Sequence, residues 1–150
     1  MDKNLRQLIE KGDVFSYLEQ TGEAFSLSGK VVEGNKVGRT LGYPTANLRT
    51  DDIKKVLPAQ GVYIARVMHN GNWYEAMVNI GIRPTLDMDH VTIEAHLFDF
   101  DKDIYGQMIR IAFLDRMRDE LRFNSLAELK VQLDRDAMLS RRLLKQVKWS

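Results

Sequence analysis

The chain has 150 residues and contains no cysteine. The absence of thiols excludes a disulfide framework, a thiolate nucleophile and a cysteine-ligated zinc site. It suits a cytoplasmic protein, which is the location we expect. No apolar run approaches the ~20 residues of a membrane-spanning helix, and the N-terminus lacks the apolar segment of a signal peptide. We therefore expect no membrane partner.

The chain also lacks an excess of either charge. It has 22 Lys and Arg residues and 21 Asp and Glu residues, so its net charge is +1. No overall electric field therefore favours binding to nucleic acid. An oligonucleotide-binding barrel would interleave aromatic and basic side chains along a strand, and the strand-like runs of this chain do not. We expect no nucleic-acid partner.

Short runs of alternating apolar and polar residues dominate the chain after residue 24. Phe25, Leu27 and Val31 share one face of the first run. Runs 61–68 and 73–80 flank an Asn-Gly pair, which is a strong hairpin signal. About six such runs precede a long helix, so the pattern predicts an antiparallel barrel or sandwich with helices outside.

The helical parts lie at the two ends. Residues 1–23 predict two short helices, the second capped by Asp13, as an appendage to a domain over residues 24–150. Ser125 to Glu128 forms a capping box that opens the C-terminal helix. Its expected buried stripe consists of Leu126, Leu129, Leu133, Ala137 and Leu144.

Two irregular segments stand between the strands. Residues 49–60 have no clear period and predict an exposed excursion that could act as a lid. Residues 81–85 contain Gly, Pro and a hydroxyl residue, and they predict a turn.

A glycine-punctuated basic loop follows the first strand and leads to a proline-stiffened polar turn. Its glycines bring backbone N–H groups close to a ligand, and Thr45 and Asn47 supply the hard oxygen ligands that a phosphate-bound Mg²⁺ takes. The spacing is one residue short of a P-loop. Phosphate binding and a plain glycine-rich hairpin both stay open on this pattern. The residues concerned are Gly34, Lys36, Gly38, Arg39, Thr45 and Asn47.

The strand-like run 91–98 carries polar residues on the face away from the expected core. Val91, Ile93, Ala95 and Leu97 point one way, whereas Glu94 and His96 point the other. A solvated outer face is one interpretation, and a carboxylate directed into a cleft is the alternative. Glu94 is flanked by apolar strand residues on both sides, whereas we expect His96 to be a scaffold group.

These motifs resemble the riboflavin kinase (flavokinase) family, and above all the C-terminal kinase domain of bacterial bifunctional riboflavin kinase/FAD synthetases. The resemblance covers about residues 24–140. It rests on Gly29-Lys30-Val31, Gly34, Gly38-Arg39, Leu41 to Asn47, Gly61-Val62-Tyr63, Asn79 to Thr85, Glu94 to Phe100, Tyr105-Gly106, and Arg118, Glu120 and Phe123.

The resemblance implies a six-stranded antiparallel Greek-key barrel that transfers the γ-phosphoryl group of ATP to riboflavin, giving FMN and ADP. By position, Glu94 would be the general base, and Thr45 and Asn47 would hold Mg²⁺ and the phosphates. Arg118 and Phe123 would lie near the flavin ring. The loop with Gly34, Lys36, Gly38 and Arg39 would cover the nucleotide.

One departure from the bifunctional enzymes concerns their N-terminal adenylyltransferase domain, because nothing in this sequence resembles its nucleotide motif. We therefore expect no FMN adenylyltransferase activity from this chain, and such a domain would be a partner only within a longer parent chain. The alternative to a kinase is a non-catalytic flavin- or nucleotide-binding module on the same barrel. A binder needs no base, so the presence of Thr45, Asn47 and Glu94 together favours the enzyme.

Overall fold

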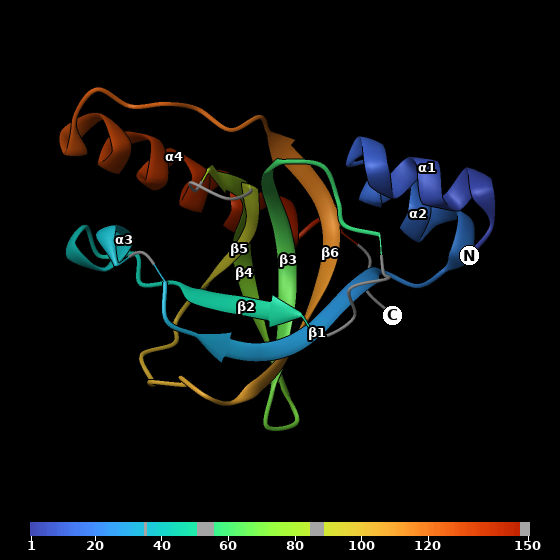
Figure 1. Ribbon diagram of the computed structural model, residues 1–150, viewed down its shortest axis with the longest axis horizontal. Coiled ribbons are helices and arrows are strands. Elements are labelled where there is room, and N and C mark those ends of the chain that lie inside the picture. The colour runs from blue at the N-terminus through green and yellow to red at the C-terminus, as the bar shows by residue number, and fades with distance from the viewer. Residues whose placement is uncertain (35, 51–55, 85–88, 148–150) are drawn as a thin grey trace.

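The computed structural model describes residues 1–34, 36–50, 56–84 and 89–147, and its centre is a closed antiparallel barrel (Figure 1). The strands follow the order β1-β2-β5-β4-β3-β6 around the barrel. Strands β3, β4 and β5 are successive neighbours, and β6 returns beside β3, which is a Greek-key connection. The predicted fold class is confirmed. The strands are β1 (Phe25–Val32), β2 (Ala46–Thr50), β3 (Gly61–His69), β4 (Asn72–Pro84), β5 (Asp89–Leu97) and β6 (Met108–Arg118).

The hairpin between β3 and β4 confirms the Asn-Gly signal. Asn70 and Gly71 have φ angles of 47° and 79°, the positive values that a tight hairpin turn requires. The turn predicted over 81–85 is wrong for residues 81–84, because these residues belong to β4 and stay paired with β5. Cross-strand pairing overrides the glycine and proline signals there, and Pro84 stands at the strand end, where a missing N–H is tolerated. Thr85 lies outside the described residues.

The barrel interior is filled by the alternating apolar side chains of the strands. Phe25, Leu27 and Val31 are buried, as their alternation predicts. The ring of Phe113 packs edge-on against Tyr63, with centroids 5.4 Å apart. Val91, which we expected in the core, is 47% exposed, because β5 meets β2 only near residues 94–95 and Val91 lies beyond that pairing.

The outer face of the barrel carries a second apolar cluster beneath helix α4 (Leu126–Leu144). Ile64, Phe98 and Leu114 belong to this cluster, together with Leu144 of α4. Leu126, expected in the buried stripe, is 58% exposed. Its exposure follows from its position, since the first turn of α4 lies at the helix end farthest from the barrel (Figure 1).

The Ser125 half of the predicted capping box is formed at the start of α4, whereas the return bond to Glu128 comes from the residue before the cap. Ser125 Oγ accepts a hydrogen bond from the N–H of Glu128 at 3.2 Å, and Glu128 Oε2 accepts one from the N–H of Asn124 at 3.1 Å. We expect Ser125→Ala to lower the free energy of unfolding by about 1 kcal/mol in urea titrations, because a helix N–H loses its partner. Ser28→Ala, at an exposed position of β1, is the control, with a change within about 0.5 kcal/mol. Equal losses would contradict a capping role.

The N-terminal helices α1 (Lys3–Lys11) and α2 (Val14–Thr21) lie beside β1 and β6 (Figure 1). Asp13 caps α2 as predicted, since its Oδ1 accepts from the N–H of Ser16 at 3.1 Å. Ile9 and Val14 are fully buried in the main core cluster. The division of the chain at residue 23 stays a prediction. Among the described residues, no helix is both long and apolar enough to cross a membrane.

Three segments differ locally from the expectation. The glycine-rich loop contains a short helix, α3 (Val37–Thr40). The sequence pattern predicts a strand over Met108 to Leu114, whereas β6 continues through Arg118. Arg49 and Thr50, expected to begin the excursion, belong to β2 and pair with β1. The middle of the predicted lid, residues 51–55, lies outside the described residues.

Candidate functional site

A cavity of about 280 Å³ lies outside the barrel, between α3, the outer faces of β4 and β5, the end of β6, and α4. Residues far apart in the sequence meet there. The cavity-lining residues include five that were predicted for the site, namely Gly38, Thr45, Glu94, Arg118 and Phe123. The fold therefore brings most of the predicted site together at one place.

Glu94 stands at the centre of a polar row that crosses three strands. It pairs with Asn47 of β2 on one side and with Asn79 of β4 on the other. Residues directly opposite each other across a sheet have Cβ atoms about 4.5–5.5 Å apart. Glu94 and Asn79 both line the cavity under α4, so this face of β5 is directed into a cleft rather than into open solvent.

Gly34 lets the chain after β1 pass directly over Asn47. A Cβ atom at Gly34 would lie 2.1 Å from Asn47 Cγ, so no other residue fits without moving the amide. Asn47 lies in β2, and Thr45 immediately precedes that strand. This close contact fixes the Asn47 side chain beside the centre of the polar row.

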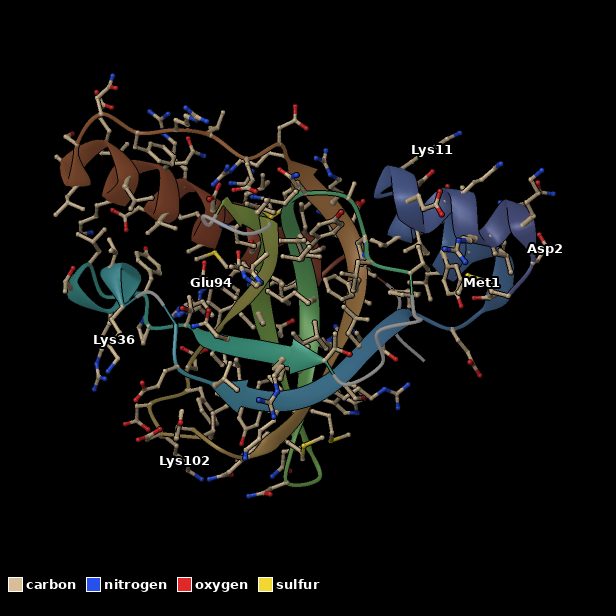
Figure 2. All side chains as sticks on the ribbon, viewed as in Figure 1. Met1, Asp2, Lys11, Lys36, Glu94 and Lys102 are labelled. Atoms are coloured by element: carbon tan, nitrogen blue, oxygen red, sulfur yellow. The ribbon has the colours of Figure 1, made fainter. Side chains whose placement is uncertain are left out.

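The two basic residues of the loop take a different position. Lys36 precedes α3 and Arg39 lies in its last turn, and both are exposed. Figure 2 shows Lys36 extending away from the barrel, whereas Glu94 sits on the barrel wall. Among the described residues that line the cavity, this loop contributes Val37 and Gly38 but neither basic side chain.

Tyr43 and His96 hold the turn that leads to Thr45. The Tyr43 hydroxyl donates to Asp134 of α4, and burial, with that carboxylate, raises the pKa of Tyr43 to about 12. His96 Nδ1 lies 2.7 Å from the carbonyl oxygen of Pro44, and its ring packs edge-on to Tyr43. Burial lowers the pKa of His96, so its neutral form is favoured in a supporting position.

Arg118 is held on the cavity wall by α4. Its Nε and Nη2 donate to the two carboxylate oxygens of Asp136 at 3.0 and 2.6 Å. The side chains are only 19% and 4% exposed, and Gln132 Nε2 also donates to Asp136 at 2.9 Å. The guanidinium therefore has a fixed place and orientation.

Sequence reasoning assigned no role to two polar residues in this cavity. Asn79 pairs directly with Glu94, and Glu120 faces Gly81 with a carboxyl whose pKa is raised by burial. The alternation of β4 could have placed Asn79 on the cavity face. The Tyr43–Asp134 and Arg118–Asp136 contacts join residues 91 and 18 positions apart and leave no local signal.

The site holds few charged metal ligands. Within the part of the chain that the structure describes, no three His, Cys, Asp or Glu side chains are grouped to hold a metal ion. Thr45 and Asn47 offer neutral oxygen donors near the Glu94 carboxylate. Such a set suits a hard cation that takes its other ligands from phosphates and water.

Curated proteins that resemble this chain share one name. A curated relative from Haemophilus influenzae, named bifunctional riboflavin kinase/FMN adenylyltransferase, is 38% identical over 133 residues, which is 88% of this chain and 42% of the relative. A relative of the same name from Bacillus subtilis is 36% identical over 135 residues, with the same coverage of both chains. The chain thus spans about two-fifths of the length of these relatives.

Solved structures share the fold. A structure described as a macrolide-efflux protein from Streptococcus pneumoniae superposes with a TM-score of 0.89 at 37% identity, covering all of this chain and 47% of that one. Riboflavin kinase from Trypanosoma brucei gives a TM-score of 0.56 at 27% identity, covering 82% and 81% of the two chains. The family model for riboflavin kinase matches residues 21–144, so the chain belongs to the riboflavin kinase (flavokinase) family, as its motifs predicted.

Proposed function

We propose that this chain transfers the γ-phosphoryl group of ATP to the terminal ribityl hydroxyl of riboflavin and releases FMN and ADP. The observation that carries the proposal is the Glu94 carboxylate in the wall of a cavity that also contains Thr45 and Arg118. Family membership supplies the reaction class, and the cavity supplies groups suited to each part of it. The chain covers 42% of the Haemophilus influenzae relative, so the FMN adenylyltransferase activity in that relative's name is not part of this proposal.

Glu94 acts as the general base. Phosphoryl transfer depends mainly on positioning and on charge stabilisation, with one group accepting the proton of the attacking hydroxyl. A carboxylate on a strand, flanked by Asn47 and Asn79 on neighbouring strands, is held in place by the sheet itself. It can receive the hydroxyl proton as the new phosphorus–oxygen bond forms.

Thr45 and Asn47 hold the metal, which we propose to be Mg²⁺, together with the phosphates of ATP. When bound, the metal would neutralise negative charge that develops on the phosphates. The neutral oxygen donors of these two residues fit a cation that keeps most of its coordination for phosphates and water. Tyr43 and His96 keep the turn before Thr45 in position.

The remaining residues of the proposed site contact the two substrates. The backbone of Gly34 and Gly38 covers the nucleotide, with Lys36 and Arg39 adding positive charge from outside the cavity. Arg118 and Phe123 adjoin the flavin ring from the side of β6 and α4. The fixed guanidinium of Arg118 gives a permanent donor for a flavin carbonyl.

We expect Gly34→Ala to weaken binding of the metal–nucleotide pair by roughly 10- to 100-fold, the usual cost of disturbing a group that orients a metal ligand. The new methyl group would overlap the Asn47 amide and push it from its place. Titration of ATP in the presence of Mg²⁺ measures the effect. Glu33→Ala, at the exposed neighbouring position, is the control and should bind as the unaltered protein does. Equal affinity of the Gly34 variant would contradict the role of Asn47.

The second candidate is a non-catalytic flavin- or nucleotide-binding module on the same barrel. One assay distinguishes the two proposals. The chain is incubated with riboflavin, ATP and Mg²⁺, and the flavins are then separated by chromatography. The kinase proposal predicts FMN without FAD, since FAD synthesis would need an adenylyltransferase domain in a longer parent chain. Riboflavin binding without FMN would support the module instead.

A further inference from the structure

Asn79 lines the cavity and carries a buried polar atom. Its Oδ1 is inaccessible to solvent and has no hydrogen-bond partner within residues 1–34, 36–50, 56–84 and 89–147. A buried acceptor without a partner is unfavourable, because it loses the hydrogen bond that water supplies in the unfolded chain. Asn79 lines the cavity, and a rotation of its terminal amide brings this acceptor to a ligand bound there.

The strand register places Asn79 between the two ends of the proposed flavin site. Going around the barrel, Glu94 pairs with Asn79, Asn79 with Val62, and Val62 with Arg118. Neighbouring strands are about 4.8 Å apart, so this row spans roughly 14 Å from Glu94 to Arg118. Asn79 is the polar member of the row that stands between the proposed base and the proposed ring contact.

A ribityl chain has the same order of parts. Its terminal hydroxyl is the group that reacts, its internal hydroxyls follow, and the flavin ring closes the other end. With the terminal hydroxyl at Glu94 and the ring near Arg118, the internal hydroxyls face Asn79. A hydroxyl donates and accepts at once, so it is a suitable partner for an amide side chain.

We propose that the Asn79 amide binds an internal hydroxyl of the ribityl chain and makes the enzyme selective for a polyol at that carbon. This inference rests on the proposed riboflavin kinase function. A site built to hydrogen-bond a hydroxyl rejects the analogue that lacks it, because the buried partner is then left unpaired. For one neutral hydrogen bond the expected penalty is roughly 10- to 100-fold in kcat/KM.

The test compares riboflavin with its 2′-, 3′- and 4′-deoxy analogues, using the unaltered chain and Asn79→Ala. In the unaltered chain, one of these analogues should react roughly 10- to 100-fold less efficiently than riboflavin. In Asn79→Ala, the penalty for that same analogue should largely disappear, whereas the penalties for the other two persist. A purely structural loss would lower all four rates together and leave their ratios unchanged.

Asn72→Ala is the matched control, because Asn72 is the exposed first residue of the same strand. Its three penalties should equal those of the unaltered chain. If Asn79→Ala does not fold, Asn79→Leu keeps the volume of the side chain without a hydrogen-bonding group and gives the same comparison. FMN formation with unchanged analogue ratios in the Asn79 variant would overturn this inference and leave the kinase proposal standing. Absence of FMN from the unaltered chain would overturn the kinase proposal itself.

Discussion

Glu94→Gln is expected to lower kcat by about 10²–10⁴-fold, the usual contribution of a positioned general base. Glutamine keeps the shape of the side chain in the polar row but cannot accept the hydroxyl proton. The row itself depends on the pairing of β5 with β2 and β4, which the substitution leaves in place. Affinities for riboflavin and ATP should therefore change little while turnover is lost.

Steady-state rates together with equilibrium titration of both substrates separate these effects. Glu75→Gln is a suitable control, because Glu75 lies on the neighbouring strand β4 and forms a long ion pair with Arg66 at 3.9 Å. Its kcat should stay near that of the unaltered chain. A Glu94 variant with unchanged kcat would remove Glu94 as the base.

Asp136→Ala should destabilise the fold by about 3–5 kcal/mol, because it leaves the Arg118 guanidinium buried without its carboxylate. Asp136 is nearly inaccessible and accepts hydrogen bonds from both Arg118 and Gln132. Within the described part of the chain, Asp136 is the one carboxylate that forms a salt bridge with Arg118. The loss should appear as a lower midpoint in urea unfolding.

The matched control is Asp119→Ala. Asp119 also pairs with an arginine of β6, Arg116, at 2.8 Å, but its side chain is 83% exposed. An exposed pair contributes at most about 1 kcal/mol, so this variant should unfold close to the unaltered chain. Equal destabilisation by the two substitutions would show that burial of the Arg118–Asp136 pair has no special effect. The double change Arg118→Met with Asp136→Leu should recover much of the stability, since an apolar pair replaces two buried charges.

The parts of the fold that were predicted correctly are those with local signals. The alternation of Phe25, Leu27 and Val31 predicts a half-buried strand, and Asn70-Gly71 predicts a hairpin, because each needs only neighbouring residues. The cap at Ser125 is equally local. These signals, with the motifs of the family, were enough to give the barrel.

The errors occur where the position of an element relative to the barrel decides the outcome. Leu126 has the spacing of a buried residue, but the first turn of α4 lies beyond the barrel wall. Val91 alternates correctly and still lies outside the stretch where β2 covers β5. Residues 81–84 look like a turn and pair as a strand because β5 is beside them. None of these facts is present in the local sequence.

The site divides in the same way. Glu94 and Thr45 could be identified from the strand pattern, the polar turn and the family motifs, and the structure puts both in one cavity. Asp136 and Asp134 support that cavity through contacts between α4 and distant segments, so no spacing rule reveals them. Lys36 and Arg39 were expected in the loop that covers the nucleotide. Both side chains are exposed and do not line the cavity, and their role stays a prediction.

The central claim is that the cavity between β5, β6 and α4 is the catalytic site. A crystal structure of the chain with ADP, Mg²⁺ and riboflavin tests it most directly. Our account predicts the terminal ribityl hydroxyl within about 2.6–3.2 Å of a Glu94 carboxylate oxygen, with the flavin ring beside Arg118 and Phe123. A flavin bound elsewhere on the barrel, with Glu94 remote from the hydroxyl, would contradict the account.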